Sequence, residues 1–277
     1  MQMNTLAGKV ALVTGSGRGI GRSVGLKLAS VGAHVVVNDL DEEPARAVVA
    51  EIREAGGMAA ACAGSVTDDD FAERFVRTAV ENYGGIDVII NNAGYTWDNV
   101  IQKMSDEQWH AIIDCHLTAP FRILRAAYPV IKEAATADAA AGRSVNRKIV
   151  NISSVSAGGN PGQINYSAAK ASVIGLTKTL AKEWGRLKVN VNAVAYGHIE
   201  TRLTQPVDGE VKTVNIEGRE IRVGISSQIV EQSKSMIPLG RPGTPDEAAG
   251  AVYMFCIPES DYVSGQLLVC GGGIGSV

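Results

Sequence analysis

The sequence predicts an α/β fold in which one doubly wound parallel sheet of seven strands carries helices on both faces. Three observations lead to this prediction. Short apolar segments alternate with longer amphipathic ones along the chain, the short segments lack polar alternation, and a cluster of glycines follows the first of them. Apolar strands without alternation are typical of a parallel sheet that is buried on both faces.

The predicted strands are short and rich in Val, Ile, Leu and Ala. A longer segment follows each one, so consecutive strands are expected to run parallel, with right-handed connections. The strands are Lys9–Val13, His34–Asn38, Met58–Cys62, Asp87–Ile90, Lys148–Ile152, Lys188–Ala193 and Gln266–Cys270.

Three helices have start signals in the sequence. Thr67 precedes a run of acids, whereas Ser105 and Thr244 are followed by Gln108 and Glu247 at the spacing of a capping box. Acids in the first turn favour a helix N-terminus because they complement the helix dipole. We therefore expect a helix after each of these three hydroxyl residues.

Two segments interrupt the alternation of strands and helices. Thr136–Arg147 is small and polar, which predicts a surface loop. Within a longer stretch at about 202–237, the β-prone arms Val211–Asn215 and Arg219–Val223 flank a Glu-Gly pair, which predicts a hairpin. No shift of composition divides the chain, so residues 1–277 are expected to form a single domain with this stretch as a substrate flap.

The composition argues against several classes of function. A net charge of −3 provides no basic field for nucleic acid or an acidic membrane, and no apolar run of about 18 residues predicts a membrane span. The four cysteines form no CxxC pair and the four histidines lack metal-ligand spacing, so we expect reduced thiols and no metal. The N-terminus has no secretory signal pattern, and we expect a cytoplasmic protein.

The glycine cluster VALVTGSGRGIG lies between the first predicted strand and the first helix. Glycine allows a tight turn and lets a phosphate approach the helix N-terminus, where free N–H groups favour anions. Asp39 ends the second predicted strand, where a carboxylate accepts hydrogen bonds from the adenosine ribose and repels a 2′-phosphate. Arg18 favours the opposite choice, because a guanidinium beside the ribose can hold that phosphate. Since the acid stands where the ribose is expected, we predict NAD rather than NADP.

Four motifs together resemble the short-chain dehydrogenase/reductase family: TGSGRGIG at 14–21, NNAG at 91–94, Ser154 followed by Tyr166 and Lys170, and NAVAYGHIET at 192–201. The resemblance covers nearly the whole chain. It is nearest to the 3-oxoacyl-carrier-protein-reductase-like members and the bacterial alcohol dehydrogenases grouped with them. It implies a Rossmann-like fold and hydride transfer between a nicotinamide cofactor and a substrate.

The tyrosine–lysine pair is the predicted reaction centre. Tyr166 and Lys170 are four residues apart and share one face of a helix. A nearby ammonium and a positive nicotinamide would lower the phenol pKa from about 10, so that Tyr166 acts as general acid or base. The family implies that Lys170 also holds the nicotinamide ribose and that a serine hydrogen-bonds the substrate oxygen. Ser154 is the expected serine and Ser153 is the alternative.

Three positions depart from the family pattern. His116 stands where the family has an asparagine that supports a proton relay, and an imidazole can make the same hydrogen bonds. Tyr196 replaces a proline after the sixth strand and can add a ring to the nicotinamide pocket. Ser65-Val66 replaces an Asp-Val pair near the adenine, with a weaker acceptor.

The resemblance, taken residue by residue, implies a complete site without metal ligands. The expected catalytic residues are Ser154, Tyr166, Lys170 and His116. The expected cofactor-binding residues are Gly15, Gly17, Arg18, Gly19, Ile20, Gly21, Asp39, Ser65, Val66, Asn92, Ala93, Gly94, Tyr166, Lys170, Gly197, Ile199 and Thr201.

We expect an NAD-dependent oxidoreductase that interconverts a small-molecule secondary alcohol and a ketone. An NADPH-dependent reductase of 3-oxoacyl thioesters, carried by a carrier protein or CoA, is the alternative enzyme; Asp39 and the absence of a basic cluster in the flap argue against it. A non-catalytic dinucleotide-binding protein is the third alternative, which the complete Ser-Tyr-Lys set disfavours. We also expect a homotetramer, because YSAAKASVIGLTKTLAKEW is apolar on more than one helix face and the family assembles through its long helices.

Overall fold

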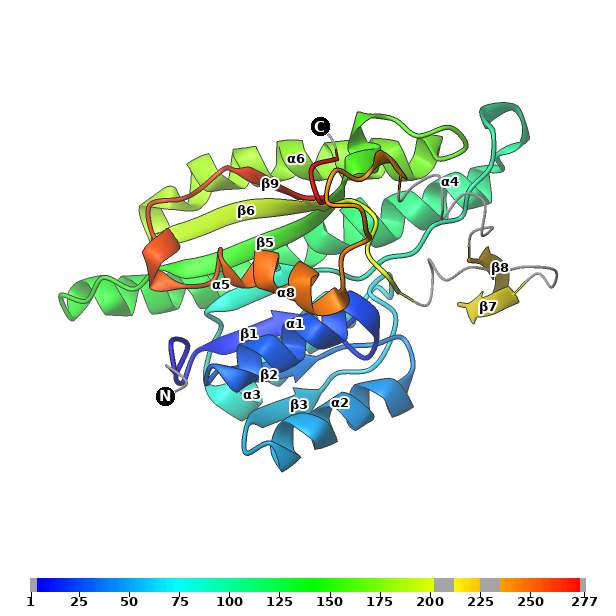
Figure 1. Cartoon of the computed structure of the whole chain (residues 1–277). Helices are drawn as coiled ribbons and strands as arrows, with labels where there is room; N and C mark the ends of the chain where they lie inside the picture. Colours follow the sequence, from blue (N-terminus) through cyan, green and yellow to red (C-terminus); the bar gives the residue numbers. More distant parts are fainter. Residues whose placement is uncertain (1–3, 202–211, 225–234, 275–277) are drawn as a thin grey trace.

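One seven-stranded parallel sheet forms the centre of the molecule, as predicted (Figure 1). The computed structural model describes residues 4–201, 212–224 and 235–274. The strand order is β3-β2-β1-β4-β5-β6-β9, and every neighbouring pair in this sheet is parallel. The strands are β1 (Val10–Val13), β2 (His34–Val37), β3 (Met58–Ala61), β4 (Val88–Asn91), β5 (Arg147–Ser154), β6 (Val189–Tyr196) and β9 (Leu267–Cys270).

Helices cover both faces of the sheet because its strands are apolar on both sides (Figure 1). In β1, Ala11 and Val13 face one core, and Val10 and Leu12 face the other. The helices of the first face are α1 (Gly19–Ser30), α2 (Glu42–Glu54) and α8 (Pro245–Tyr253), and those of the second are α3 (Phe71–Tyr83), α4 (Asp106–Ile113), α5 (Ala119–Ala140) and α6 (Ile164–Trp184). None of the helices in the described residues is long and apolar enough to cross a bilayer.

The strand order reverses at β1, because the chain builds β2 and β3 on one side of it and then crosses to β4 on the other. Ligands of open α/β sheets bind at the carboxyl ends of the strands beside such a reversal. A ligand site is therefore expected among the segments that follow β1, β2, β4 and β5.

Two of the predicted helix starts are confirmed in detail. The Ser105 and Thr244 hydroxyls accept hydrogen bonds from the N–H groups of Gln108 and Glu247, whose side chains bond back to the capping residues. The third start is displaced. Residues 67–70 form a turn instead, closed by the Phe71 N–H on the Asp68 carbonyl at 3.1 Å, and α3 begins at Phe71.

The predicted surface loop at Thr136–Arg147 is wrong over half its length. Helix α5 continues to Ala140, and Arg147 already belongs to β5. Alanine has the highest helix propensity, so an Ala-rich end extends the helix. The Asp138 carboxylate then ties this end to the sheet by accepting hydrogen bonds from Arg143 and Arg147, each at 2.9 Å.

The predicted hairpin is present as β7 (Lys212–Ile216) and β8 (Arg219–Val223), outside the main sheet (Figure 1). Its two-residue turn places Glu217 at φ 53° and Gly218 at φ 80°. Positive φ at both central residues defines the tight turn that suits the twist of a hairpin. The parts of the expected flap at 202–211 and 225–234 lie outside the described residues.

Candidate active site

A cleft of about 1110 Å³ opens at the carboxyl ends of the central strands. It receives residues from the glycine turn, the segments after β2 to β6, helices α4 and α6, and the hairpin. Every predicted site residue lines this cleft except Gly17, which packs behind it: a Cβ there would lie 2.5 Å from Oδ2 of Asp39.

The glycine turn fits a phosphate at the start of α1. Gly19, the first residue of this helix, has φ +52°, and within the described structure a Cβ added to it would meet only the Thr201 side chain, at 3.9 Å. Gly21 packs so closely on the Gly15 carbonyl that a side chain would overlap it. Among the described residues, no side chain caps the N-terminus of α1. Its free N–H groups therefore face the cleft, which is the arrangement that binds a pyrophosphate.

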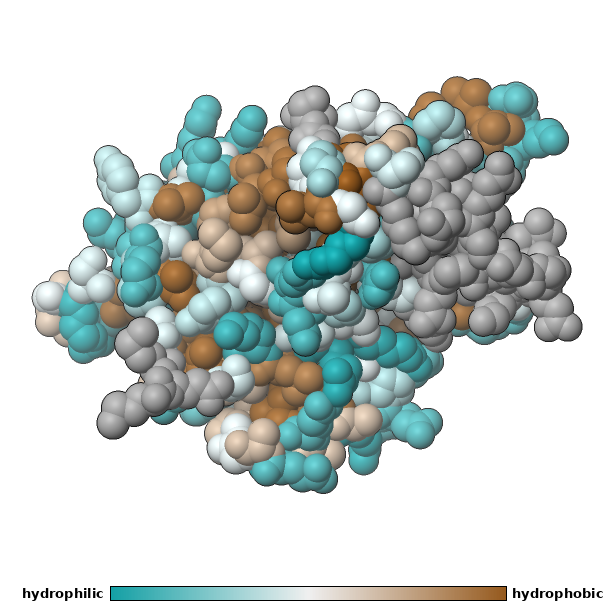
Figure 2. All heavy atoms as spheres, in the orientation of Figure 1, coloured by the Kyte–Doolittle hydropathy of each residue, from teal (hydrophilic) through white to brown (hydrophobic). Residues whose placement is uncertain are grey.

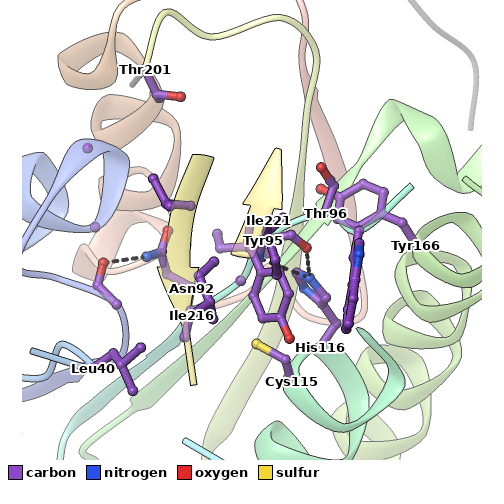
Figure 3. Close-up of a pocket in the computed structure, with 18 of the residues that line it drawn as sticks. Leu40, Asn92, Tyr95, Thr96, Cys115, His116, Tyr166, Thr201, Ile216 and Ile221 are labelled. Atoms are coloured by element: carbon purple, nitrogen blue, oxygen red, sulfur yellow. Dashed lines mark hydrogen bonds between the residues drawn. The ribbon is translucent and has the colours of Figure 1, made fainter. Parts of the chain in front are cut away.

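The NNAG segment holds the glycine turn in place. The Asn92 amide donates to the carbonyls of Thr14 and Gly15 at 2.9 and 3.1 Å (Figure 3). The Thr14 hydroxyl accepts the N–H groups of Asn92 and Ala93 at 2.9 and 3.0 Å. Sequence reasoning missed Thr14, although it opens the glycine motif. Its hydroxyl joins the ends of β1 and β4 where the cleft begins.

Asp39 lies at the end of β2 with only 6% of its surface exposed. Its Oδ1 accepts a hydrogen bond from the Arg18 guanidinium at 2.8 Å, and the same guanidinium reaches Asp41 at 2.8 Å. The cation that could hold a 2′-phosphate is thus shared by two carboxylates. The geometry suits hydroxyl groups at this position better than a phosphate.

Tyr166, Lys170 and Ser154 meet at the floor of the cleft. The Lys170 Nζ donates to the Ile152 carbonyl at 2.7 Å and lies 5.5 Å from the centre of the Tyr166 ring. The Ser154 hydroxyl donates to the Tyr196 carbonyl at a long 3.4 Å and is also close enough to the phenol to affect its pKa, whereas the Ser153 hydroxyl donates to the Lys170 carbonyl at 2.9 Å. The geometry therefore favours Ser154 over Ser153 as the hydroxyl that faces a substrate.

The two ionisable groups of this centre have shifted pKa values. Burial raises the pKa of Tyr166 to about 12, against a hydrogen bond from Ser154 that lowers it. Burial lowers the pKa of Lys170 to about 8. The sequence argument expected the ammonium to lower the phenol pKa. The surrounding protein does the opposite, because the ring is desolvated and the Lys170 ammonium is directed at a carbonyl.

His116 lies on a π-helical segment, Asp114–Thr118, between α4 and α5. It is 3% exposed, and its Nε2 lies 2.7 Å from the Tyr95 carbonyl and 3.3 Å from the Tyr95 nitrogen (Figure 3). The shorter contact fits a proton on Nε2, which leaves Nδ1 as an acceptor. Nδ1 is buried with no partner among the described residues. Burial and the nearby Lys170 hold the pKa of His116 well below its usual value. The ring is therefore neutral and stands edge-on to Tyr166, with centroids 5.1 Å apart.

Tyr196, which was expected to add a ring to the nicotinamide pocket, is among the residues that line the cleft, but its hydroxyl is directed away from it. The hydroxyl donates to the Ala248 carbonyl on α8 at 3.1 Å, and burial raises its pKa. The backbone nevertheless keeps a regular path, because β6 continues through Tyr196. The next residue, Gly197, packs tightly on Gly271.

Comparisons with known proteins agree with this geometry. The model of the short chain dehydrogenase family matches residues 9–212. The chain is 38% identical over 271 residues to 3-oxoacyl-acyl-carrier-protein reductase FabG of Thermotoga maritima, with 97% of this chain and 98% of that protein covered. It is 38% identical over 275 residues to the 3-oxoacyl-acyl-carrier-protein reductase of Synechocystis, with 98% and 99% covered. For FabG of Staphylococcus aureus the identity is 37% over 268 residues, with 96% and 98% covered.

The family assignment thus stands on the parallel sheet, on the cleft at its switch point and on matches that span nearly the whole chain. The chain belongs to the short-chain dehydrogenase family and is an NAD(P)-dependent oxidoreductase that acts on hydroxyl and keto groups.

Proposed function

We propose that the protein interconverts the 3-oxo and 3-hydroxy forms of an acyl thioester, with NAD(H) as the hydride carrier. The observation that carries this proposal is the cluster of Ser154, Tyr166 and Lys170 at the floor of the cleft, in a chain whose near-full-length relatives are named as 3-oxoacyl reductases. A 3-hydroxyacyl group is itself a secondary alcohol. This substrate replaces the simple ketone that was the main expectation from the sequence with the acyl thioester of the alternative enzyme, whereas NAD(H) is kept as the carrier.

The proposed mechanism gives each side chain one task. The nicotinamide, when bound, supplies or accepts the hydride. Tyr166 donates its proton to the substrate oxygen during reduction, and a pKa of about 12 keeps that proton in place at neutral pH. Ser154 hydrogen-bonds the same oxygen as negative charge develops on it. Lys170 keeps a positive charge beside the phenol, and His116 fixes the Tyr95 carbonyl and packs against the reacting ring.

The proposed preference for NAD(H) rests on Asp39. Its carboxylate can accept the hydroxyls of the adenosine ribose, and a 2′-phosphate there would face two carboxylates that share one guanidinium. Direct kinetics with NADH and NADPH test this choice. A preference for NADPH would show that Arg18 outweighs both acids.

The second candidate function is reduction of a small ketone that is not attached to a carrier. The acidic side chains on the cleft wall favour this function. Asp98, Glu217 and Glu220 line the cleft, whereas Arg18 and Lys170, the Lys and Arg residues among its described lining, already have partners. An acidic wall disfavours an acidic carrier protein at the entrance.

One experiment separates the two candidates. Reduction kinetics are measured with acetoacetyl-CoA, acetoacetyl carrier protein and a panel of simple ketones. The proposal expects kcat/KM for a thioester to exceed that for every simple ketone by at least about tenfold, which corresponds to about 1.4 kcal/mol of transition-state binding. A simple ketone that equals the thioesters would favour the second candidate.

We also propose a homotetramer in the cytoplasm. Phe121 on α5 and Ile164 on α6 are exposed, and Figure 2 shows apolar side chains gathered over the region of the edge strand β9. Apolar side chains on long helices and on a sheet edge suit contacts between identical subunits. The four cysteines are free thiols, as a reducing compartment favours.

A further inference from the structure

The adenine end of the cleft lies at the outer strands of the sheet. A pyrophosphate at the start of α1 and a ribose at Asp39 place the dinucleotide across the ends of β1 and β2. The reaction centre at Tyr166 lies on the other side, beyond β4. The base attached to the ribose must therefore extend toward β3, where Leu40, Ser65 and Val66 line the cleft.

A carboxylate is delivered to this end from a distant part of the chain. The tip of the β7–β8 hairpin places the Glu217 side chain on Ser65, whose hydroxyl donates to Oε1, and the Thr67 hydroxyl donates to the same oxygen at 2.9 Å. The Arg219 guanidinium donates to Oε2 at 2.8 Å. Both oxygens of this carboxylate are thus oriented beside Ser65 and Thr67 at the adenine end of the cleft.

The backbone at Glu217 also points to a role for its side chain. It adopts φ 53° in a two-residue turn whose positive φ values suit Asn or Gly. A residue with a long side chain is unfavourable in that conformation, and such strain gathers at functional sites. The other non-glycine residue with positive φ in the described chain, Lys188, lies at a helix end away from the cleft.

The hairpin is held over the cleft at its other contacts as well. Arg219 donates to Glu107 of α4 at 2.8 Å and stacks over Trp97 at 5.8 Å. Ile221 is 1% exposed and faces the cleft with Ile216 (Figure 3). These contacts hold the hairpin between α4 and the end of β3. The position of the Glu217 side chain is therefore set by the packing of the hairpin as well as by its own hydrogen bonds.

We propose that Glu217 recognises the adenine base by accepting a hydrogen bond from its 6-amino group. An amino group on a purine is a donor, and a carboxylate is a strong acceptor for it. A purine with an oxo group at the same position would place an acceptor against the carboxylate. The proposal needs only a bound adenine dinucleotide, so it is independent of the substrate and of the choice between NAD and NADP.

The test compares binding of NAD with binding of nicotinamide hypoxanthine dinucleotide, which carries an oxo group in place of the amino group. Isothermal titration calorimetry measures both dissociation constants for the full-length wild type, Glu217→Gln and Glu220→Gln. Glu220 is the matched control, because it is an acid on the same hairpin that bonds only Asn215 among the described residues. Melting curves of all three proteins show that the fold is intact.

The wild type should bind NAD at least about tenfold more tightly than the hypoxanthine analogue, the scale of one charge-assisted hydrogen bond. Glu217→Gln should bring this ratio close to one, because an amide can donate to the oxo group, and Glu220→Gln should keep the wild-type ratio. An unchanged ratio in Glu217→Gln overturns the proposal. Tighter binding of NAD by Glu217→Gln also overturns it, because the carboxylate would then obstruct the base.

Discussion

Burial shifts Tyr166 and Lys170 in opposite directions, because one ionises to an anion and the other to a cation. A phenol with a pKa of about 12 is protonated at neutral pH, so it holds the proton that ketone reduction requires. It is a poor base for alcohol oxidation until other charges in the cleft lower that value. The residue chemistry thus favours reduction at neutral pH.

Tyr166→Phe should lower kcat by at least about 10²-fold, the scale of general acid–base catalysis, while NAD binding changes little. The substitution removes the proton carrier and keeps the ring that packs on His116. Steady-state kinetics and calorimetric titration with NAD measure the two effects. Tyr83→Phe, remote from the cleft, is the control, and retention of most of the wild-type kcat would remove Tyr166 from the proposed mechanism.

The pH profile should report Lys170. With a pKa of about 8, its ammonium is charged below pH 8 and neutral above it, while Tyr166 stays protonated over the same range. The kcat/KM for ketone reduction should therefore fall as the pH rises through about 8. In Lys170→Arg the guanidinium remains charged, so the fall should disappear although the maximal rate is lower. If kcat/KM of Lys170→Arg still fell as the pH rises through about 8, the titrating group would be a residue other than Lys170.

Gly94 and His116 should behave as a coupled pair. A Cβ on residue 94 would overlap Cε1 of His116 and lie 2.7 Å from Nδ1. Gly94→Ala should destabilise the protein by about 1–3 kcal/mol in urea unfolding, the usual cost of overpacking. The double variant with His116→Ala should cost less than the sum of the two single changes, because the clash is then relieved. Strict additivity would show that the loop moves aside instead.

Site residues that are close in sequence were predictable, and those brought together by tertiary packing were not. Tyr166 and Lys170 share a helix face whatever the rest of the fold does. Glu217 meets Ser65 across 152 positions of sequence. The alternation of β-prone residues indicated a hairpin, but periodicity contains no information on which surface a hairpin packs against.

At the scale of elements, the end of α5 shows how a local signal can mislead. Small polar residues at 136–147 are typical of a loop, yet Asp138 has two arginine partners that the sequence did not pair. The carboxylate joins the last turn of α5 to the first residue of β5. This ion pair, and not local propensity alone, decides where the helix ends and the strand begins.

Asp138→Asn should cost about 3 kcal/mol of unfolding free energy at pH 7, because it leaves the Arg147 guanidinium buried without a counter-charge. The hydrogen bond from Arg147 holds the pKa of Asp138 below its usual value of about 3.9. The stabilisation is therefore complete above about pH 4 and is lost as the pH falls further. Urea unfolding at several pH values measures the difference.

Asp69→Asn is the control for this ion pair, since Asp69 is exposed and pairs with Arg122 at the surface. It should cost less than about 1 kcal/mol. Equal costs for the two substitutions would mean that the Asp138 pair behaves as a surface pair. A wild-type advantage over Asp138→Asn that persisted undiminished at pH 3 would contradict the lowered pKa.

At the scale of the whole molecule, the parallel sheet, its seven strands and the position of the cleft were predictable because buried strands and glycine turns are local patterns. The strand ends were less so, since β5 continues to Ser154 and β6 to Tyr196, two and three residues beyond the predicted ends. Assembly depends on surfaces, which an isolated sequence describes poorly. The proposed homotetramer predicts that light scattering gives about four times the 29.0 kDa chain mass. Phe121→Glu should yield smaller species if α5 forms a subunit contact, since Phe121 is 49% exposed there.

Met58→Glu supplies the control for this experiment, because Met58 is exposed on β3 at the opposite edge of the sheet from β9. It should leave the mass unchanged. A monomeric wild type at micromolar concentration would refute the assembly, and a tetramer that survives Phe121→Glu would place the contact elsewhere.

Helices α4 and α5 are joined without a break by the π-helical segment at 114–118, which rotates the side-chain positions of α5 about the helix axis relative to those of α4. Each helical residue advances by about 100°, and one extra residue in a turn rotates everything beyond it by that amount. Helix α4 can thus pack on α6 while α5 packs on α3, although the two are continuous. Removing one residue from 114–118 would restore a plain α-helix of similar length. It would also rotate the apolar face of α5 away from α3. The extra residue of the π-helical segment therefore lets α4 and α5 each face their own partner, α6 and α3.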